Sequence, residues 1–329
     1  MRRSRRLPTI ALLVAALGSA ACGSKGDAGP STVRQDDVLT YRHGVDLDVQ
    51  QSKRETEGPL RTEQLEYSSV DGQRVPALFA VPTGHAPLGC LIFVPGFTQP
   101  KETLPELREG LAKLRLATFT IDARNVGARG SAERARAAAK KAEGVRAMLL
   151  DTVADLRVGL DWLERRAECH SNIAVLGTSF GATVATHLAA QDDRIKAAVL
   201  TSVGATYKQA ILMRPLAAKI VPDLPNYVAN AAEDPAVLDH AVKVLRPYDL
   251  ERWIGKIAPR PVMLINGRFD PIVAPGDALQ LAAAARSPKT VLYFNGGHDP
   301  FARGPDYDKV AVKTTEFLMD SLDLPPPAA

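Results

Sequence analysis

The sequence of 329 residues has few of the features that mark metal, nucleotide or repeat proteins. Its three cysteines and six histidines form no zinc-binding pattern. Its glycines make neither a P-loop nor a dinucleotide-binding signature, and we find no internal repeat. We therefore expect that the protein needs no metal and no organic cofactor.

An excess of one charge is also missing once the start of the chain is set aside. The formal net charge is +4, but residues 1–21 contain four arginines and no acidic residue, so the rest of the chain is neutral. The basic cluster at 134–141 is typical of the solvated face of a helix. We expect no nucleic-acid partner, because the sequence offers no basic patch.

The N-terminus has a short apolar stretch in place of a membrane span. Arginines precede the stretch Ile10–Leu17, and small residues follow it up to Ala21. A basic start, a short apolar core and small residues predict a signal peptide over residues 1–21. The stretch is too short to cross a bilayer as a mature anchor. We therefore expect an exported protein.

Cys22 follows the predicted signal peptide directly. Small residues that end in a cysteine resemble the bacterial lipobox, which implies a lipid on Cys22, a membrane partner and a location in the bacterial cell envelope. Ser19 stands where the commonest pattern has leucine, so ordinary cleavage after Ala21 is the alternative. Residues 22–37 contain a Gly- and Ser-rich run and predict a flexible tether. We assign residues 38–329 to one catalytic domain.

The most informative motif is Gly177-Thr178-Ser179-Phe180-Gly181. An apolar run over 173–176 precedes it and a helix-prone stretch over 182–190 follows it. A strand, a sharp turn and a helix with serine at the apex are typical of a nucleophile elbow. Such a turn strains the serine backbone and leaves no room for side chains at the two glycines. Ser179 is therefore the predicted nucleophile.

An activated serine needs a base and a carboxylate that orients the base. Asp270 follows the predicted strand 261–266, and His298 follows the predicted strand 290–294, with a helix-like segment between them. Parallel strands that helices connect have all their carboxyl ends at one edge of a sheet. We predict His298 as the base and Asp270 as the orienting acid. Asp270 as a turn cap and Asp299 as the acid are the alternatives.

The other histidines fit the role of base less well. His187 lies within the helix after the elbow, where a core or surface role is expected, and His170 precedes the elbow strand at the wrong end of the sheet. His43, His85 and His240 follow no predicted buried strand.

The chain resembles the α/β-hydrolase superfamily over roughly residues 62–322. The resemblance is carried by Val94-Pro95-Gly96-Phe97, by the elbow, by residues 259–270 and by Gly297-His298. It is nearest to the group of dienelactone hydrolases, acetyl-xylan esterases and prolyl-oligopeptidase-like proteins. The implied fold is α/β, a doubly wound and mostly parallel sheet with helices on both faces. A hairpin over 62–81 and a small helical cap at about 204–256 complete the expectation.

The resemblance implies an oxyanion hole of two backbone N–H groups. We expect one from Phe180, directly after the nucleophile, and one from Phe97, in the loop after the strand 90–94. The run Asp122-Ala123-Arg124-Asn125-Val126-Gly127 is similar to a superfamily motif of structural role. Within the cap, 211–213 and 216–221 either line an acyl pocket or pack on the core.

The implied activity is that of a serine carboxylic-ester hydrolase with a small-molecule ester substrate. A peptidase or an acyltransferase with the same triad is the alternative, although the chain lacks room for the N-terminal propeller of related peptidases. A non-catalytic envelope lipoprotein on the same scaffold is a third. The sequence does not define the oligomeric state.

Cys90 and Cys169 remain once Cys22 carries lipid. Each lies near the start of one of two strands that the superfamily places side by side. Counting back from the strand ends pairs Cys90 with Asn172 and leaves Cys169 about three residues out of register. We therefore favour two separate buried thiols. The alternative is a disulfide, which requires a chain that curls back at His170-Ser171.

Overall fold

The structure is a computed structural model, and it describes residues 47–219, 228–302 and 304–325. The predicted signal peptide, Cys22 and the tether lie outside the described residues, as does His43. Among the helices of the described ranges, none is long and apolar enough to cross a membrane.

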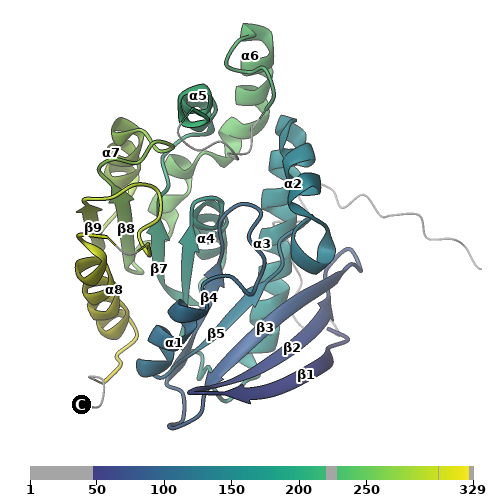
Figure 1. Ribbon diagram of the computed structural model, residues 1–329, viewed down its shortest axis with the longest axis vertical. Coiled ribbons are helices and arrows are strands. Elements are labelled where there is room, and N and C mark those ends of the chain that lie inside the picture. The colour runs from purple at the N-terminus through teal and green to yellow at the C-terminus, as the bar shows by residue number, and fades with distance from the viewer. Residues whose placement is uncertain (1–46, 220–227, 303, 326–329) are drawn as a thin grey trace, which may run out of the picture. The chain divides into compact units, whose positions relative to one another are not determined.

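The chain forms one nine-stranded sheet in the order β1-β2-β3-β5-β4-β6-β7-β8-β9 (Figure 1). Strands β4 to β9 pair in parallel, whereas β1, β2 and β3 pair antiparallel with one another and β3 pairs antiparallel with β5. This arrangement confirms the predicted mostly parallel sheet. The strands are β1 Gln50–Glu57, β2 Leu60–Ser68, β3 Arg74–Pro82, β4 Gly89–Val94, β5 Leu116–Ile121, β6 Ile173–Thr178, β7 Ile195–Thr201, β8 Val262–Gly267 and β9 Lys289–Phe294.

Eight α-helices are present in the described part of the chain. They are α1 Pro105–Lys113, α2 Ala132–Ala139, α3 Ala142–Glu164, α4 Phe180–Gln191, α5 Tyr207–Ala217, α6 Pro235–Leu245, α7 Pro275–Ala284 and α8 Tyr307–Ser321. The basic cluster at 134–141 lies on and just after α2, where Arg134, Lys140 and Lys141 are exposed as predicted.

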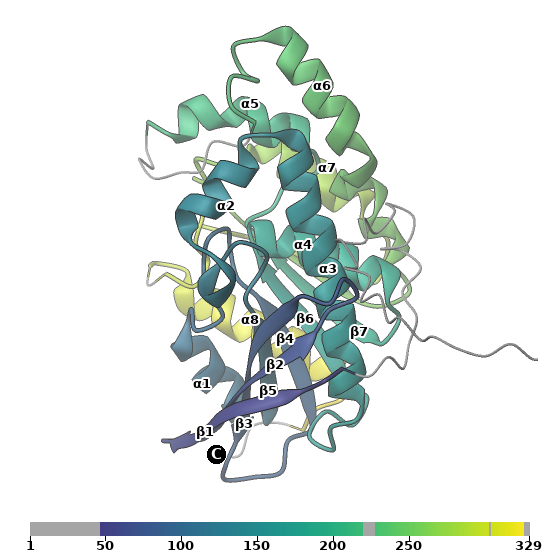
Figure 2. The same cartoon turned by 90° about the vertical axis from the view of Figure 1, so that its right-hand side faces the viewer.

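The two faces of the sheet are covered by different helices. Along β4, Ile92 packs in the core that α3 and α4 cover, whereas the next residue, Phe93, packs in the core that α1 and α8 cover. Successive side chains of a strand point to opposite faces, so β4 contributes to both cores. Figure 2 shows α3 and the pair α1 and α8 on opposite sides of the strands.

The predicted hairpin is confirmed as β2 and β3, and Gly72 in its turn has a left-handed φ of 77°. Strand β1 was not predicted. All eight of its residues are exposed, so the sequence carries no alternation of apolar and polar side chains.

The predicted cap region contains α5 and α6, with residues 220–227 outside the described ranges. Ile211 of α5 and Leu245 of α6 are buried together with Val145 of α3 in a small apolar cluster of their own. The cap is therefore anchored to the sheet domain through α3.

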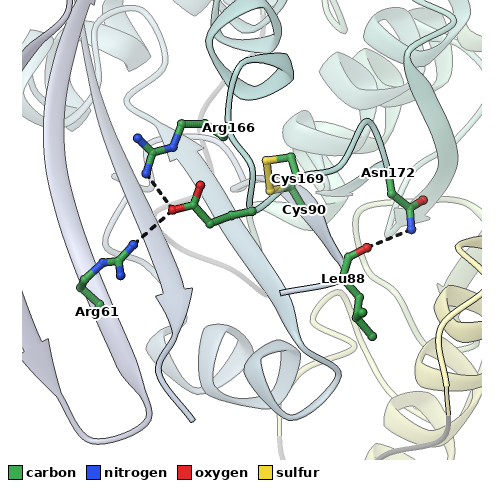
Figure 3. The surroundings of a disulfide bond; sticks show 7 residues. Arg61, Leu88, Cys90, Arg166, Cys169 and Asn172 are labelled. Carbon is green, nitrogen blue, oxygen red and sulfur yellow. Dashed lines mark hydrogen bonds and ion pairs between the residues drawn. A yellow bond between two sulfur atoms is a disulfide. The ribbon is translucent and has the colours of Figure 1, made fainter. Parts of the chain in front are cut away.

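Cys90 and Cys169 form a disulfide with 4.8 Å between their Cα atoms (Figure 3). The favoured interpretation of two separate thiols is therefore wrong. Cys90 pairs with Ile173, one residue from the predicted partner. His170 and Ser171 have left-handed φ values of 50° and 55°, and this turn brings Cys169 back over the start of β4.

Polar contacts hold the same turn in place. The side-chain amide of Asn172 donates to Leu88 O at 3.2 Å, and Cys90 N donates to Asn172 O at 2.9 Å. Arg61 and Arg166 both donate to Glu168 Oε1, beside Cys169. The disulfide lies at the amino ends of β4 and β6, the edge of the sheet opposite to the strand ends that precede Ser179, Asp270 and His298.

Candidate active site

Ser179 lies between the end of β6 and the first residue of α4, as the motif predicts. Its backbone has φ 57° and ψ −119°, a strained conformation for a non-glycine residue. A Cβ at Gly177 would lie 2.3 Å from Gly181 O, and a Cβ at Gly181 would lie 2.0 Å from Val94 O. Both glycines are therefore required by close backbone contacts on either side of the turn.

The structure brings Ser179, His298 and Asp270 together although they are far apart in sequence. His298 Nε2 lies 2.9 Å from Ser179 Oγ, and His298 Nδ1 lies 2.8 Å from Asp270 Oδ2. The His298 side chain is 23% exposed, whereas that of Asp270 is 1% exposed. A buried carboxylate thus faces one ring nitrogen and the serine hydroxyl faces the other.

Asp270 also caps a turn, so it makes the contacts of both interpretations. Its Oδ1 accepts hydrogen bonds from Ile272 N at 2.8 Å and Val273 N at 3.0 Å. These bonds fix the carboxylate while Oδ2 faces His298. Asp299, the alternative acid, has its Oδ1 bonded to Phe301 N instead.

The loop that carries His298 is held against two neighbouring strand ends. A Cβ at Gly267 would lie 2.0 Å from Gly297 O, so glycine at the end of β8 lets this loop approach. The Ser202 hydroxyl donates to the backbone carbonyl of His298. Ser202 was not predicted. It follows β7, has a φ of 56°, and is 1% exposed.

The two predicted oxyanion donors lie in adjacent segments. Phe180 is the first residue of α4, a position whose N–H has no acceptor within the helix. The Phe97 and Phe180 rings pack edge to face with centroids 5.8 Å apart. Gly96 N donates to Gln99 Oε1 at 2.8 Å, and this bond fixes the loop that contains Phe97.

Asp122 ties the Phe97 loop to the end of β5. Its carboxylate is fully buried and accepts from Lys101 N and Lys101 Nζ, both at 2.9 Å, and from Ala128 N at 3.0 Å. Arg124 pairs with Asp155 at 2.9 Å. Gly127 has φ 56° and leaves the space that the Asp122 carboxylate occupies. The motif therefore has the expected structural role.

A cavity of about 80 Å³ adjoins Ser179 and His298. Three residues of α5, Tyr207, Ala210 and Arg214, line it with the spacing of one helix face. Of the two alternatives for 211–213 and 216–221, packing holds for Ile211, which is buried in the cluster of α3, α5 and α6, whereas Leu216 is 53% exposed; none of the described residues of these ranges lines the cavity. Ile220 and Val221 lie outside the described residues. The cavity is therefore lined by α5, but by another face of this helix than the one that carries Ile211.

Two buried carboxylates hold the first turn of α5 beside this cavity. Asp277 Oδ1 accepts from the Thr206 hydroxyl at 3.2 Å, and Asp249 Oδ1 accepts from Tyr207 N at 2.8 Å. Burial raises the pKa of each carboxyl to about 6. Asp277 lines the cavity, so the site contains one carboxyl group besides that of Asp270.

The remaining histidines of the described chain have other positions. His187 is fully buried with Nε2 3.0 Å from Tyr248 O, and burial lowers its pKa to about 4. His240 is exposed and lies 2.7 Å from Glu143. His170 is in the turn beside the disulfide, and His85 is exposed in a loop. Among the described residues, no group of three or more His, Cys, Asp or Glu side chains is placed to hold a metal ion.

Comparison with known proteins identifies the family of the chain. A sequence model of the alpha/beta hydrolase family matches residues 91–311. The Escherichia coli protein Esterase YjfP is 25% identical over 228 residues, which cover 67% of this chain and 84% of that protein.

Solved structures share the fold at low sequence identity. Acetyl xylan esterase 1 from Thermoanaerobacterium has a TM-score of 0.66 and 16% identity, and covers 86% of this chain and 92% of its own. An acetyl xylan esterase from Paenibacillus has a TM-score of 0.67 and 17% identity, covering 86% and 91%. The chain belongs to the alpha/beta hydrolase family and has its fold.

Proposed function

We propose that the protein is a serine carboxylic-ester hydrolase that works through Ser179, His298 and Asp270. The observation that carries the proposal is the continuous chain of contacts from Asp270 Oδ2 through the His298 ring to Ser179 Oγ. The similarity to Esterase YjfP supports an ester as the substrate.

In the first half of the reaction, Ser179 Oγ attacks the acyl carbonyl while His298 Nε2 takes the hydroxyl proton. Asp270 stabilises the imidazolium that forms and fixes the tautomer that presents a bare Nε2 to the serine. Negative charge develops on the carbonyl oxygen, where the N–H groups of Phe97 and Phe180 stabilise it together with the dipole of α4. His298 then protonates the leaving alcohol.

The second half of the reaction releases the acid. His298, again neutral at Nε2, takes a proton from a water molecule as the water attacks the acyl-enzyme carbonyl. Collapse of the second tetrahedral intermediate breaks the bond to Ser179 Oγ, and His298 returns the proton to the serine. The ring needs no large movement between these steps, because Asp270 contacts its Nδ1 and the Ser202 hydroxyl holds the backbone carbonyl of His298.

The cavity beside Ser179 favours a short acyl group. Its volume is about 80 Å³, well below the roughly 300 Å³ at which drug-sized ligand sites begin. We propose acetyl and similarly small acyl esters as the preferred substrates.

A panel of p-nitrophenyl esters of rising chain length tests this function, beside an amide of the same acid. We expect hydrolysis of the acetate, falling with chain length, and little cleavage of the amide. Ser179→Ala and His298→Ala should each lose at least ~10³-fold in kcat. Asp270→Asn should be impaired and retain more activity. Activity that survives in Ser179→Ala would refute the assignment.

The peptidase, acyltransferase and non-catalytic alternatives give other results in the same assay. Preference for the amide would favour a peptidase, and faster release with an added alcohol would favour an acyltransferase. A fluorophosphonate probe that leaves Ser179 unlabelled would favour a binding protein.

We also propose export and a lipid anchor on Cys22. The disulfide supports export, because such bonds persist in oxidising compartments and are rare in the cytosol. Mass spectrometry of the mature N-terminus is the test. An unmodified Cys22 argues against lipidation, and an intact Met1 argues against export.

A further inference from the structure

The nucleophile and the base follow strands that are not neighbours in the sheet. Two strands, β7 and β8, lie between β6, which precedes Ser179, and β9, which precedes His298. Figure 1 shows β7, β8 and β9 side by side in this order. His298 Nε2 nevertheless lies 2.9 Å from Ser179 Oγ. The loop after β9 therefore folds back over the end of β8 and reaches the end of β7.

Two consecutive residues at the end of β7 contact both the nucleophile and the base. Thr201, the last residue of the strand, accepts a hydrogen bond at its carbonyl oxygen from Ser179 N at 2.9 Å. The hydroxyl of the next residue, Ser202, donates to His298 O. A single planar peptide unit between positions 201 and 202 thus connects the backbone of the nucleophile to the backbone of the base.

Ser202 is the residue that holds the backbone of His298. In the described part of the chain, the ring of His298 bonds to the other two members of the triad, and the bond from Ser202 is the one that reaches its backbone. The nearest other bond to this loop, from Phe269 N to Gly296 O at 3.0 Å, lies two residues earlier. The position of His298 along the sheet edge therefore depends on the Ser202 hydroxyl.

The backbone of Ser202 has a left-handed conformation, with a φ of 56°, in which glycine is the favoured residue. Two bonds to β8 hold it there: Ser202 N donates to Ile265 O at 2.8 Å, and Val203 N donates to Oδ1 of the buried Asn266 at 2.9 Å. Glycine would adopt this conformation at lower cost, but it has no hydroxyl. A strained residue that its surroundings hold in place is typical of a functional position.

We propose that Ser202 is a positioning residue, which sets the distance between Ser179 Oγ and His298 Nε2 through its bond to the His298 backbone. The inference rests on the proposed function, because it concerns the activation of Ser179. Without the hydroxyl, the loop after β9 loses its contact with β7, so the imidazole moves relative to the nucleophile. A displacement of about 1 Å in an active site costs up to about 100-fold in rate.

Ser202→Ala and Ser202→Gly test the proposal, because both remove the hydroxyl while they differ in backbone strain. Ser202→Ala keeps a Cβ in the left-handed conformation and should have a lower urea midpoint than wild type. Ser202→Gly relieves the strain and should have a higher midpoint than Ser202→Ala. We expect kcat for p-nitrophenyl acetate to fall by about 10- to 100-fold in both variants, with KM within about two-fold of wild type.

The rate at which a fluorophosphonate probe labels Ser179 reports the activation of this serine without turnover. It should fall by about the same factor as kcat in both variants. A residue that only stabilises the fold predicts instead that activity follows stability, with kcat restored in Ser202→Gly. Wild-type kcat and labelling in either variant, or their recovery in Ser202→Gly alone, overturns the proposal.

Ser171→Gly is the matched control. Ser171 is exposed and has a φ of 55°, and it precedes β6 at the edge of the sheet that carries the disulfide. This variant should gain stability from the same relief of strain and keep wild-type kcat. A wild-type protein that hydrolyses no ester and is not labelled refutes the proposed function, and this inference with it. Active wild-type protein with unaffected Ser202 variants refutes the inference alone.

Discussion

Gly181 lies so close to Val94 that a Cβ at position 181 would come within 2.0 Å of the Val94 carbonyl oxygen. This contact joins the first turn of α4 to the start of the loop that contains Phe97. The same glycine therefore sets the distance between the two predicted oxyanion donors.

Gly181→Ala should lower kcat for p-nitrophenyl acetate by at least about 100-fold, because displacement of one loop by about 1 Å has effects of that size. The measurement is kcat per folded protein, with folding checked by circular dichroism. Gly110→Ala, at a position with open space, should keep full activity. A folded Gly181→Ala protein with wild-type kcat would show that the Phe97 loop is not part of the oxyanion hole.

Asp122→Asn should lower both stability and activity. Asp122 is fully buried, and its partner Lys101 has a side chain that is 8% exposed. Removing one charge of a buried pair costs about 3 kcal/mol, here reduced in part by the second contact of Lys101 with Glu102. Urea unfolding measures the loss of stability. The kcat for p-nitrophenyl acetate measures the loss of activity that we expect when the loop between Phe97 and Lys101 moves. Glu133→Gln, which breaks an exposed pair with Arg136, should change neither.

Replacement of both Cys90 and Cys169 by alanine should lower the free energy of unfolding by about 2–4 kcal/mol, because the bridge closes a loop across 79 residues. Activity at 25 °C should stay close to wild type, since the bridge lies at the edge of the sheet opposite to Ser179. Thiol titration of the denatured wild-type protein without reductant provides the direct check. Two reactive thiols besides Cys22 would contradict the disulfide.

Asp249→Asn should stabilise the protein at pH 8 and have little effect at pH 4. Burial raises the pKa of Asp249 to about 6, whereas the unfolded value is about 3.9. Between these values the folded state binds more protons than the unfolded state, so this group makes stability fall as pH rises from about 4 to 6. The gain at pH 8 should be at most about 3 kcal/mol.

Asparagine at position 249 keeps an oxygen for the bond from Tyr207 N, which limits the loss of that contact. Urea unfolding at the two pH values measures the difference. Asp308→Asn, at an exposed position on α8, is the control for loss of a negative charge. Equal effects of Asp249→Asn at pH 4 and pH 8 would contradict the raised pKa.

The positions of Ser179, Asp270 and His298 were predictable because topology alone brings them together. Each residue follows a strand, and adjacent parallel strands end at one edge of the sheet. Their mutual contacts needed no knowledge of side-chain packing beyond that rule.

Other parts of the fold and of the candidate site depend on contacts that leave no local pattern in the sequence. Ser202 looks like any serine after a strand, and its bond to the His298 carbonyl exists only in the fold. The lining of the cavity depends on which face of α5 turns inward, and the mixed apolar and polar sequence of that helix does not define a face. The disulfide depends on two consecutive left-handed residues, His170 and Ser171, neither of which is glycine.

The neighbouring strands β4 and β6 are joined by a covalent bond at their amino ends and carry the predicted catalytic loops at their carboxyl ends. The disulfide and the proposed catalytic residues therefore lie at opposite ends of the same two strands. Laboratory evolution of this protein toward other esters can therefore change the loops at one end of the strands without touching the disulfide at the other end. Libraries confined to the residues around Phe97, Tyr207 and Arg214 leave the disulfide and its surrounding hydrogen bonds intact. The stability that these contacts contribute is kept, so the protein tolerates more destabilising substitutions around Phe97, Tyr207 and Arg214.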